Sequence, residues 1–380
     1  MKLIFVSNYI NHHQIPLSEE LLRLTGGDYI FLQTKPMTCE RIKMGWDPEA
    51  LNKPYVRIYD EDREFYDRLL IEAECVIFGG AEDEELIIPR LEKGKFTIRY
   101  SERIYKEGRY KFISPRGLKK KYHDHIRFRR SNVYLLCAGA YVAGDFNLIL
   151  SYPGKKLKFG YFPEFIEYEN LHELRSKKER DIENKIEILW VGRFIDLKHP
   201  EVIFKLAGKL KERNVNFHIS MIGALDKENQ FEEELSSYNL TSLDISFLGS
   251  MSPEKVREHM RRADVFIVTS DRREGWGAVV NEAMNSGCVV LAPKEIGAAG
   301  YLIKDKENGF IYSSCNVKEV LKLLLWVLDN RETSLKMGEK AYESIKKEWN
   351  ASVAAERLME FIESRGKEIF KYESGPLSRA

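Results

Sequence analysis

The feature that most constrains the fold of this chain is a regular alternation of short apolar runs, rich in β-branched residues, with longer segments of helical period. This alternation is typical of βα units, which build parallel sheets covered by helices. In the first half we expect strands at 2–8, 29–34, 55–59, 75–80, 96–101, 133–138 and 157–162. In the second half the pattern restarts, with strands expected at 186–192, 216–223, 245–249, 265–270, 288–292 and 310–313.

The length of the chain, 380 residues, is too great for one ordinary core and suits two domains of about 180 residues each. We therefore predict an α/β fold with two doubly wound domains, at residues 1–165 and 166–350, connected through a charged segment at 164–185. Helices are expected at 317–328, 332–349 and 352–366. Residues 351–380 would then form a C-terminal helix, able to pack back on the first domain, and a frayed polar tail.

Charge and cysteine content exclude several classes of function. The formal net charge is +1, so no overall field favours nucleic acid or an acidic partner. The five cysteines are widely spaced, mostly within apolar runs and without a C-x-x-C pair, which indicates buried free thiols in a reducing compartment. The chain shows no signal peptide, and no apolar run reaches the roughly 18 residues of a membrane span. We therefore expect a cytoplasmic protein, at most peripheral on the inner face of a membrane.

The most informative motif is TSDRREGWGAVVNEAMNSG, at the end of the strand expected at 265–270. It places Glu274 in the loop and Glu282 in the next helix, beyond the carboxyl end of a parallel strand, where α/β proteins bind ligands. Gly275 and Gly277 allow the backbone to approach a ligand closely, and the start of the helix offers amides to a diphosphate. A nucleoside diphosphate-sugar requires this combination of donors for its phosphates and acceptors for its hydroxyls. The alternative is a surface helix with a glycine-containing entry turn.

The motif resembles that of family 4 of the retaining glycosyltransferases, which have the GT-B fold, because both contain E-G-[FW]-G and then E-A-M-x-x-G, with seven residues between the two glutamates. The resemblance implies two facing Rossmann-like domains. It also implies that Glu274 contacts the transferred sugar and Glu282 the ribose of the donor. The residues expected to line the donor between them are Gly275, Trp276, Gly277, Ala278 and Val279.

Two further segments resemble the same family. VGRFIDLKHP is similar to the family's G-R-x-x-x-x-K, which implies that Arg193 and Lys198 bind the donor phosphates and hold the charge of the leaving group. In isolation such a pair would suit an exposed helix start equally well. FLGSMSPE places Gly249 and Met251 where the backbone of the family holds the nucleobase.

The resemblance extends over nearly all of the second domain. One departure lies in IGAAGYLIKDKENGFIY, where Ala298 and Tyr301 stand in place of a frequent Gly and Glu, so no donor contact is carried over from that loop. The implied donor is a UDP-, GDP-, dTDP- or ADP-sugar, without a further cofactor. Arg193 and Lys198 would make a divalent metal unnecessary for phosphate binding.

The first domain resembles glycosyltransferases of bacterial surface-polysaccharide assembly, through SNYINHHQIPL, YIFLQT and YSERIYKEG. Its candidate acceptor residues follow the first and fifth strands, and they are Asn11, His12, His13, Gln14, Ser101, Glu102 and Arg103. Among them, Glu102 is the catalytic candidate for orienting the acceptor hydroxyl. The alternatives are a helix-capping loop with solvated histidines, and a local salt bridge and cap in the Ser-Glu-Arg turn.

From Arg99 to Arg130 the chain has twelve Lys or Arg residues against three Asp or Glu, interleaved with tyrosines and phenylalanines. This mixture suits an anionic membrane surface or a lipid-diphosphate acceptor. Nucleic acid is not expected, because the rest of the domain is acidic on balance and no nucleic-acid-binding module is recognisable. The alternative is a solvated helix face. The acidic stretches at 60–62 and 82–85 are interpreted as N-terminal turns of helices rather than as a metal site.

Together these observations predict a retaining glycosyltransferase of the hexosyltransferase type. It would transfer a sugar from a nucleotide-sugar to a glycan or lipid-linked glycan acceptor, in surface-polysaccharide biosynthesis. Retention of the anomeric configuration is implied by the resemblance alone. Two alternatives from other classes are a sugar-nucleotide epimerase with the same fold, which would convert its substrate without an acceptor, and a non-catalytic nucleotide-sugar-binding subunit.

Overall fold

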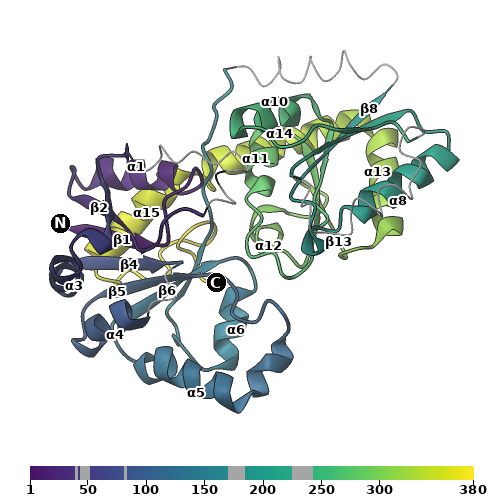
Figure 1. Cartoon of the computed structure of the whole chain (residues 1–380). Coiled ribbons are helices and arrows are strands. Elements are labelled where there is room, and N and C mark those ends of the chain that lie inside the picture. Colours follow the sequence, from purple (N-terminus) through teal and green to yellow (C-terminus); the bar gives the residue numbers. More distant parts are fainter. Residues whose placement is uncertain (39–41, 43–51, 81–83, 170–184, 225–242) are drawn as a thin grey trace. The chain divides into compact units, whose positions relative to one another are not determined.

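The computed structural model describes residues 1–38, 42, 52–80, 84–169, 185–224 and 243–380. The chain forms two compact units (Figure 1). Unit 1 comprises Met1–Glu164 and Glu348–Ala380, and unit 2 comprises Phe165–Lys347. Each unit has its own parallel sheet and its own hydrophobic core.

The described part of unit 1 contains a sheet of seven strands. These are β1 (Leu3–Ser7), β2 (Tyr29–Gln33), β3 (Val56–Ile58), β4 (Cys75–Gly79), β5 (Thr97–Ser101), β6 (Val133–Ala138) and β7 (Lys156–Phe159). Their order in the sheet is β3-β2-β1-β4-β5-β6-β7, and all neighbours are parallel. The strands β1, β4 and β6 are buried along their whole length, as expected for a parallel sheet with both faces covered.

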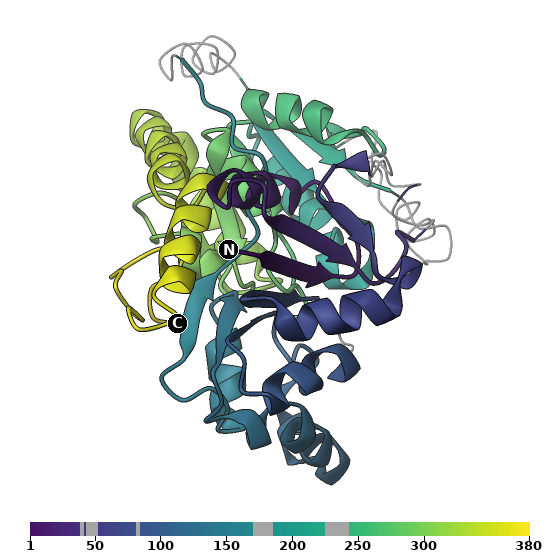
Figure 2. The same cartoon turned by 90° about the vertical axis from the view of Figure 1, so that its left-hand side faces the viewer.

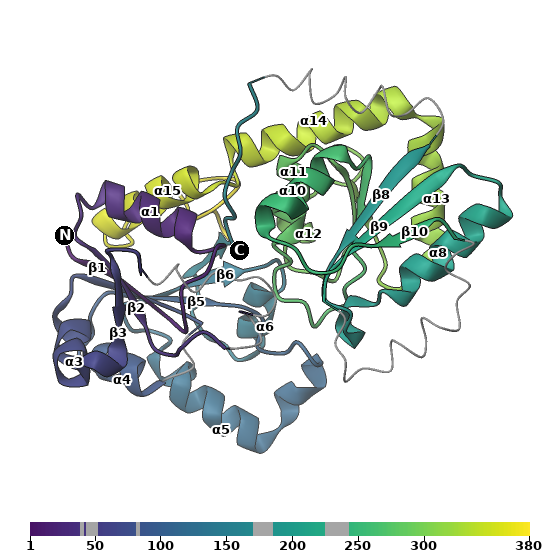
Figure 3. The ribbon, with the colours of Figure 1, turned by 45° about the horizontal axis from the view of Figure 1, so that its top comes forward.

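Helices cover both faces of this sheet. They are α1 (Ile15–Leu24), α3 (Arg63–Glu72), α4 (Glu84–Glu92), α5 (Pro115–Asp124), α6 (Val142–Leu148) and α15 (Ala351–Glu363). Figures 1 and 3 show α1 and α15 side by side on one face of the sheet, with α3 and α4 on the other. The ring of Phe361 in α15 lies 6.0 Å from that of Phe96 and 5.0 Å from that of Tyr134. The C-terminal helix is therefore part of the unit 1 core.

Side-chain caps begin several of the helices. Asp62, Ser114 and Asn350 each accept a hydrogen bond from the amide three residues further on, at the starts of α3, α5 and α15. Asp62 ends the acidic stretch at 60–62, so this stretch forms a helix start, as expected. In the second acidic stretch, residues 82 and 83 lie outside the described residues, and Glu84 and Glu85 occupy the first turn of α4.

The C-terminal tail is ordered, and the expectation that it is frayed was wrong. The amide of Leu377 donates to the carbonyl of Lys158, and the amide of Lys158 donates to the carbonyl of Ser378, both at 2.8 Å. Leu377 and Ser378 are buried. The tail therefore pairs with the edge strand β7, whose backbone groups would otherwise face solvent, and Figure 2 shows the C-terminus beside the sheet.

The described part of unit 2 contains a sheet of six strands. These are β8 (Ile186–Val191), β9 (Phe217–Ile222), β10 (Ile245–Phe247), β11 (Val265–Ile267), β12 (Val289–Pro293) and β13 (Phe310–Tyr312). Their order is β10-β9-β8-β11-β12-β13, again with parallel neighbours throughout.

Six described helices flank this sheet. They are α8 (Glu201–Glu212), α10 (Pro253–Arg262), α11 (Val279–Asn285), α12 (Ala299–Leu302), α13 (Val317–Asp329) and α14 (Arg331–Lys347). One core cluster joins the inward faces of α8 and α13 to alternate residues of β8 and β9, such as Ile188 and Ile219. In Figure 1, α8 and α13 lie together on one side of this sheet, and α10, α11 and α14 lie on the other.

Both sheets have the strand order of a doubly wound α/β fold. The order reverses between β1 and β4 in unit 1 and between β8 and β11 in unit 2. The prediction of an α/β fold with two such sheets and a helical C-terminus is confirmed. Most of the charged segment expected at 164–185 lies outside the described residues. One thiol differs from expectation, because Cys315 is exposed, whereas Cys75, Cys137 and Cys288 are buried.

Candidate functional site

In unit 2 the loops that follow β8 and β11 meet at the point where the strand order reverses. Lys198 lies in the first loop, and its Nζ donates a hydrogen bond to Oε2 of Glu274 in the second. The two residues are 76 positions apart, and their side chains are 15% and 18% exposed. The structure thus brings two of the candidate residues into contact where doubly wound sheets bind ligands. Arg193 lies half-buried in the same loop as Lys198.

Hydrogen bonds from the core hold these two loops. The amide of Asp271 donates to the carbonyl of Leu197 at 3.0 Å. The hydroxyl of Thr269 donates to the carbonyl of Lys198 and accepts from the indole of Trp190 at 2.8 Å. Because Trp190 and Thr269 are both buried, core packing sets the position of the Lys198 backbone.

A chain of alternating charges, not evident from the sequence, joins the same loops. His199 lies with Nδ1 2.8 Å from Oε1 of Glu201 and with Nε2 3.1 Å from Oδ2 of Asp271. Asp271 also accepts from Arg273, whose guanidinium lies 2.6 Å from Asp196. The hydrogen bond to Glu201 is the main cause of the raised pKa of His199. Burial alone would raise the pKa of Asp271, but hydrogen bonds from Arg273 and His199 lower it.

The turn between Glu274 and α11 is shaped by packing. Gly277 has φ +90°, a backbone conformation that favours glycine. Trp276 is buried, and its indole donates to Oδ1 of Asn281 at 2.8 Å. The amide of Ala298 donates to the carbonyl of Trp276 at 2.9 Å. Trp276 is therefore a core residue, and any contact that it makes with a ligand involves its backbone.

Helix α11 begins at Val279, with Ala278 as its N-cap and the buried Gly275 shortly before it. The first amides of a helix have no partner within the helix. Glu282 is the fourth residue of α11 and is buried. Burial raises the pKa of Glu282 to about 7, while the charge of Arg257 acts in the opposite direction. This environment differs from that of a glutamate on a surface helix, which was the alternative for this segment.

Glycines follow three neighbouring strands of the unit 2 sheet. The amide of Gly192, after β8, donates to Ile222 in β9, and the amide of Gly223 donates to the carbonyl of Gly249, after β10. A Cβ atom on Gly223 would lie 1.8 Å from the carbonyl oxygen of Gly192, so this position excludes any side chain. Met251 lies half-buried in the loop before α10. At these three glycines the ends of the strands present backbone rather than side chains.

In unit 1 the loop after β1 is held by hydrogen bonds among its own side chains. Asn11 Nδ2 donates to Gln14 Oε1 at 2.9 Å, and Asn11 Oδ1 accepts from the amide of His13 at 3.0 Å. Gln14 Nε2 donates to the hydroxyl of Ser7 at 3.2 Å. The rings of His12 and His13 lie 3.8 Å apart. These contacts make the loop a compact turn before α1 rather than a set of solvated side chains.

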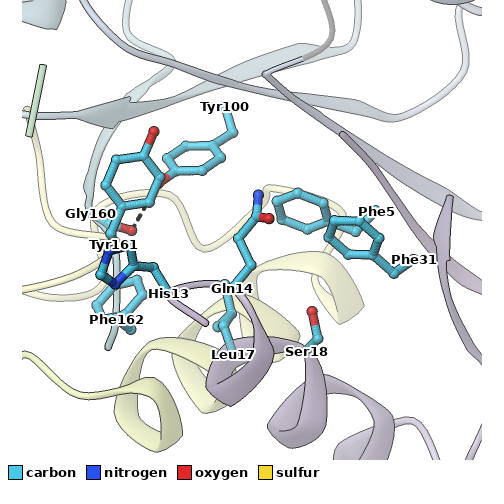
Figure 4. Close-up of a pocket in the computed structure, with 10 residues that line it drawn as sticks. All are labelled: Phe5, His13, Gln14, Leu17, Ser18, Phe31, Tyr100, Gly160, Tyr161 and Phe162. Carbon is cyan, nitrogen blue, oxygen red and sulfur yellow. Dashed lines mark hydrogen bonds between the residues drawn. The ribbon is translucent and has the colours of Figure 1, made fainter. Parts of the chain in front are cut away.

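A small cavity lies beside this loop (Figure 4). In Figure 4 the rings of Phe5 and Phe31 lie side by side, the rings of Tyr100 and Tyr161 lie opposite them, and Gln14 reaches between the two pairs. The hydroxyl of Tyr100 donates to the carbonyl of Gly160 at 3.0 Å. The cavity therefore places the loop after β1 next to the tyrosines that lie near the end of β5.

Glu102 follows β5 and is held by two donors. Its Oε1 accepts from the hydroxyl of Tyr161 at 2.8 Å, and its Oε2 accepts from Lys106. The hydroxyl of the neighbouring Ser101 donates to the carbonyl of Glu102 at 2.9 Å. Burial and the charge of Glu102 raise the pKa of Tyr161, which keeps the hydroxyl protonated as a donor. Tyr161 follows β7, and its contact with Glu102 could not be read from the sequence.

Arg103, a candidate acceptor residue, is held by contacts within unit 1. Its guanidinium lies 3.2 Å from Asp145, and it packs 5.0 Å from the ring centroid of Tyr141. Asp145 is 0% exposed, and it also accepts from the amide of Tyr105 and pairs with Arg109. The geometry favours a structural role for Arg103, because its charge is used to anchor the loop after β5.

The basic segment from Arg99 to Arg130 divides into inward and outward sets. Arg99 is buried, pairs with Glu84 and donates to the carbonyl of Asp124 at 2.7 Å, so it does not belong to a surface. The outward set combines the exposed cations Lys111, Arg116, Lys119 and Lys120 with the exposed apolar or aromatic side chains Tyr110, Ile113 and Tyr122. Tyr110 is 68% exposed and Ile113 is 75% exposed. We call this outward set the α5 surface.

The ligand atoms of Glu84, Asp124 and His125 lie close enough together to hold a cation. The guanidinium of Arg99 already binds both Glu84 and the backbone of Asp124, however, and Tyr152 hydrogen-bonds His125 at 2.8 Å. The arrangement is that of a buried ion pair under α5. Across the described ranges, no helix combines the length and the apolar character that crossing a membrane requires.

Solved structures share this architecture over nearly the whole chain. The Anabaena protein HepE, in complex with UDP and glucose, is 13% identical with a TM-score of 0.68, covering 96% of this chain and 100% of that chain. Sucrose-phosphate synthase from Thermosynechococcus elongatus is 14% identical with a TM-score of 0.66, covering 96% and 99%. The chain therefore has the GT-B class of fold, with two parallel-sheet α/β domains.

A family model narrows this class. Residues 172–344 match the model described as Glycosyl transferases group 1. This part of the chain, which is a little under half of it, is therefore similar to that family of transferases.

Curated relatives match over part of their length. Trehalose synthase of Pyrococcus horikoshii is 27% identical over 209 residues, which are 53% of this chain and 49% of that protein. The sulfoquinovosyl transferase of Arabidopsis thaliana is 28% identical over 183 residues, which are 47% of this chain and 34% of that protein. The chain thus spans about half or less of the length of these two relatives.

Proposed function

We propose that this protein is a retaining glycosyltransferase, which transfers a sugar from a nucleotide-sugar to a glycan or lipid-linked glycan acceptor in surface-polysaccharide biosynthesis. The observation that carries the proposal is the contact of Lys198 with Glu274 where the strand order of unit 2 reverses. A cation for phosphate and a carboxylate for sugar hydroxyls are thereby adjacent, on loops held by the core. The match of residues 172–344 to a glycosyltransferase family supports the same assignment.

The donor site follows from this pair. Arg193 and Lys198 bind the diphosphate and stabilise the charge that develops on the leaving nucleoside diphosphate. The backbone from Gly275 to Val279 adds amide donors at the start of α11. Glu274 accepts hydrogen bonds from the transferred sugar, and the buried Glu282 accepts them from the ribose. The backbone at Gly249 and Met251 contacts the base.

The base and the sugar of the donor can be identified by testing several nucleotide-sugars in turn. The Anabaena protein of similar fold binds UDP and glucose, so UDP-glucose is the first donor to test, followed by GDP-, dTDP- and ADP-sugars.

On the acceptor side, Glu102 orients the attacking hydroxyl. Tyr161 and Lys106 hold its two oxygens, so that its carboxylate has a defined direction. Asn11, His12, His13, Gln14 and Ser101 are the further acceptor candidates of unit 1. Retention is proposed without a covalent intermediate: the nucleoside diphosphate leaves first, and the acceptor attacks from the same face.

The experiment that tests the proposed function follows one nucleotide-sugar with and without acceptor. The wild-type protein is incubated with the donor and a glycan or lipid-linked glycan fraction, and the product is examined by NMR. We expect release of nucleoside diphosphate and a new glycosidic bond with the anomeric configuration of the donor. Conversion of the nucleotide-sugar into its epimer in the absence of acceptor would instead identify an epimerase, and an inverted product would contradict retention.

Transfer should proceed without a divalent metal. Arg193 and Lys198 supply the positive charge that a metal provides in other phosphate sites, so treatment with EDTA should leave the rate unchanged. The measurement is nucleoside diphosphate release before and after chelation. Loss of activity that manganese restores would contradict the assignment of the phosphate site.

The α5 surface is the proposed contact with an anionic membrane that carries the acceptor. Exposed cations attract anionic lipid headgroups, and exposed aromatic and apolar side chains suit the interfacial layer. The helix that carries it, α5, is fixed to unit 1 by buried contacts on its other side, between Arg99 and the backbone of Asp124. Figures 1 and 3 show α5 at the periphery of unit 1.

Reversing three exposed charges on the α5 surface should release the protein from anionic vesicles. The replacement is Arg116, Lys119 and Lys120 by Glu, because the neighbouring Lys121 lies near the buried Asp124 and Glu84 and is unsuitable for a surface test. Each cation near the surface contributes about 1 kcal/mol, so loss of the three alone should lower vesicle affinity on the order of 100-fold, and the added negative charges should lower it further. Vesicle co-sedimentation measures this change.

The matched control reverses exposed lysines elsewhere in unit 1, at Lys93, Lys95 and Lys367. This control should bind anionic vesicles like the wild type, and neutral vesicles should bind neither protein well. Equal binding of the α5-surface variant and the wild type to anionic vesicles would leave the segment as a solvated helix face.

A further inference from the structure

His199 has a backbone conformation that is unfavourable for a residue with a side chain. It follows the short helical turn Asp196–Lys198 and has φ +47° and ψ +52°. The left-handed region is disfavoured whenever a Cβ atom is present. A residue remains there when its surroundings hold it, and such positions cluster at functional sites. The contacts of the His199 ring are therefore candidates for what holds the backbone in this conformation.

Both ring nitrogens of His199 face carboxylates. Nδ1 lies 2.8 Å from Glu201, and Nε2 lies 3.1 Å from Asp271. A neutral imidazole has one N–H and would turn a lone pair toward one of these carboxylates, whereas an imidazolium donates to both. The geometry is that of a charged ring that bridges two acidic residues.

This bridge connects the two loops of the donor site. His199 directly follows Lys198 in the loop after β8. Asp271 precedes Glu274 in the loop after β11, and the amide of Glu274 donates to the carbonyl of Asp271 at 3.1 Å. The imidazolium bridge thus lies next to both members of the Lys198–Glu274 pair.

We infer that His199, as an imidazolium, is a positioning residue that holds Lys198 against Glu274 and makes nucleotide-sugar binding dependent on pH. The inference rests on the proposed donor site and requires no contact between His199 and the donor. It goes beyond that proposal because it assigns a regulating charge to a residue outside the ligand-binding set.

The surrounding charges set the direction of the pH effect. The charged or titratable groups near the ring are Glu201 in α8, Asp271 and Arg273 after β11, Asp196 and Lys198 in the preceding turn, and Cys315 after β13. The pKa of His199 is raised, first by the hydrogen bond to Glu201. The Cys315 residue is exposed, but partial desolvation of its thiol raises the thiol pKa, which keeps the thiol neutral. The bridge is therefore intact below the raised pKa of His199 and is lost as the pH rises through it, so donor affinity should fall on the alkaline side.

The test measures the affinity of the full chain for a nucleotide-sugar by calorimetry between about pH 6 and about pH 9, on either side of the ordinary pKa of histidine. UDP-glucose is the first probe, because its diphosphate is esterified at both ends and does not titrate in this range. We expect the affinity of the wild type to fall roughly tenfold toward the alkaline end, a coupling of ordinary size.

Two variants separate positioning from a structural role. Glycine and asparagine both tolerate the left-handed backbone, and neither titrates, so His199→Gly and His199→Asn should stay folded, because relief of the backbone strain offsets part of the loss of the two ion pairs. Both should bind like the wild type at the alkaline end and about tenfold more weakly than the wild type at the acidic end, because they lack the His199 transition. The titration of Glu282, whose pKa is about 7, is present in wild type and variants alike and cancels in the comparison.

Several outcomes would overturn the inference. A ratio of wild-type to variant affinity that stays the same from the acidic to the alkaline end would do so directly. NMR after selective ¹⁵N labelling of histidine gives an independent readout. At a pH just above the ordinary pKa of histidine, the His199 ring should still carry protons on both nitrogens. A singly protonated ring at that pH would contradict the bridge. If no nucleotide-sugar binds the wild type, the proposed function fails, while the NMR result still decides the state of His199.

Discussion

Replacing Glu274 with alanine should slow sugar transfer by about 100-fold or more while unit 2 stays folded. The carboxylate is proposed to hold the transferred sugar as the bond to the leaving diphosphate breaks, and removing one such group costs roughly 100-fold to 1,000-fold in rate. Arg193→Ala should have an effect of similar size, because it removes charge from the leaving-group site. The measurement is nucleoside diphosphate release from the donor that the wild type uses.

Stability should fall moderately in the Glu274 variant. Lys198 loses its partner in a mostly buried pair, so the loss in the free energy of unfolding should be about 1–3 kcal/mol, as for other hydrogen bonds to charged groups. Glu332→Ala is the matched control, because it also removes a carboxylate paired with a lysine, Lys336, on the surface of α14. A Glu274→Ala protein that turns over like the wild type would remove this residue from the donor site.

Replacing Asp145 with alanine should destabilise unit 1 by about 3 kcal/mol, because it leaves a buried charge without a partner. Asp145 is fully buried and pairs with Arg103, whose side chain is 8% exposed. The same carboxylate accepts from the amide of Tyr105. The loop between β5 and α5, which carries Glu102, would lose its anchor. Hydrogen exchange of the unit 1 amides measures the change in this unit separately.

Two comparisons test the cause of that loss. Glu107→Ala breaks an exposed pair with Lys111 in the same loop and should cost less than about 1 kcal/mol. Adding Arg103→Met to Asp145→Ala removes the unpaired charge and should recover part of the stability. If the double variant were as unstable as the single variant, the unpaired guanidinium would not be the reason.

The strands and their alternation with helices could be predicted because the signal is local. Short runs such as Leu3–Ser7 and Ile186–Val191 are buried on both faces, so they appear as continuous apolar sequence. The expected strands at 245–249 and 265–270 were too long, since the structure ends them at Phe247 and Ile267. Their apolar character continues into the loops that carry the site.

The donor-site residues could be selected because the motifs around Glu274 and Lys198 are compact in sequence. The bridge from His199 to Asp271 could not be predicted from the sequence, because these residues are 72 positions apart and meet only in the folded protein. The same holds for Tyr161 and Glu102, which are 59 positions apart. Pairings of this kind depend on the register of neighbouring strands, for which a single sequence carries no signal.

The burial of some charged and polar residues could not be predicted from the sequence either. Arg99 and Arg103 belong to a basic segment that looks solvent-facing in the sequence, but each is paired with a carboxylate inside unit 1. The C-terminal tail is polar, and it is ordered because its backbone completes the edge of the sheet at β7. Composition alone does not distinguish a solvated charge from one that meets a distant partner.

The central claim is that the loops after β8 and β11 form a nucleotide-sugar site, and calorimetry with UDP-, GDP-, dTDP- and ADP-glucose tests it most directly. We predict that the wild type binds at least one of the four with a single site per chain. Lys198→Ala should weaken that binding by about tenfold or more, as expected for the loss of a charged hydrogen bond, whereas Lys211→Ala, on the exposed side of α8, should leave it unchanged. Absence of binding by any nucleotide-sugar, or equal affinity in the wild type and Lys198→Ala, would contradict the account.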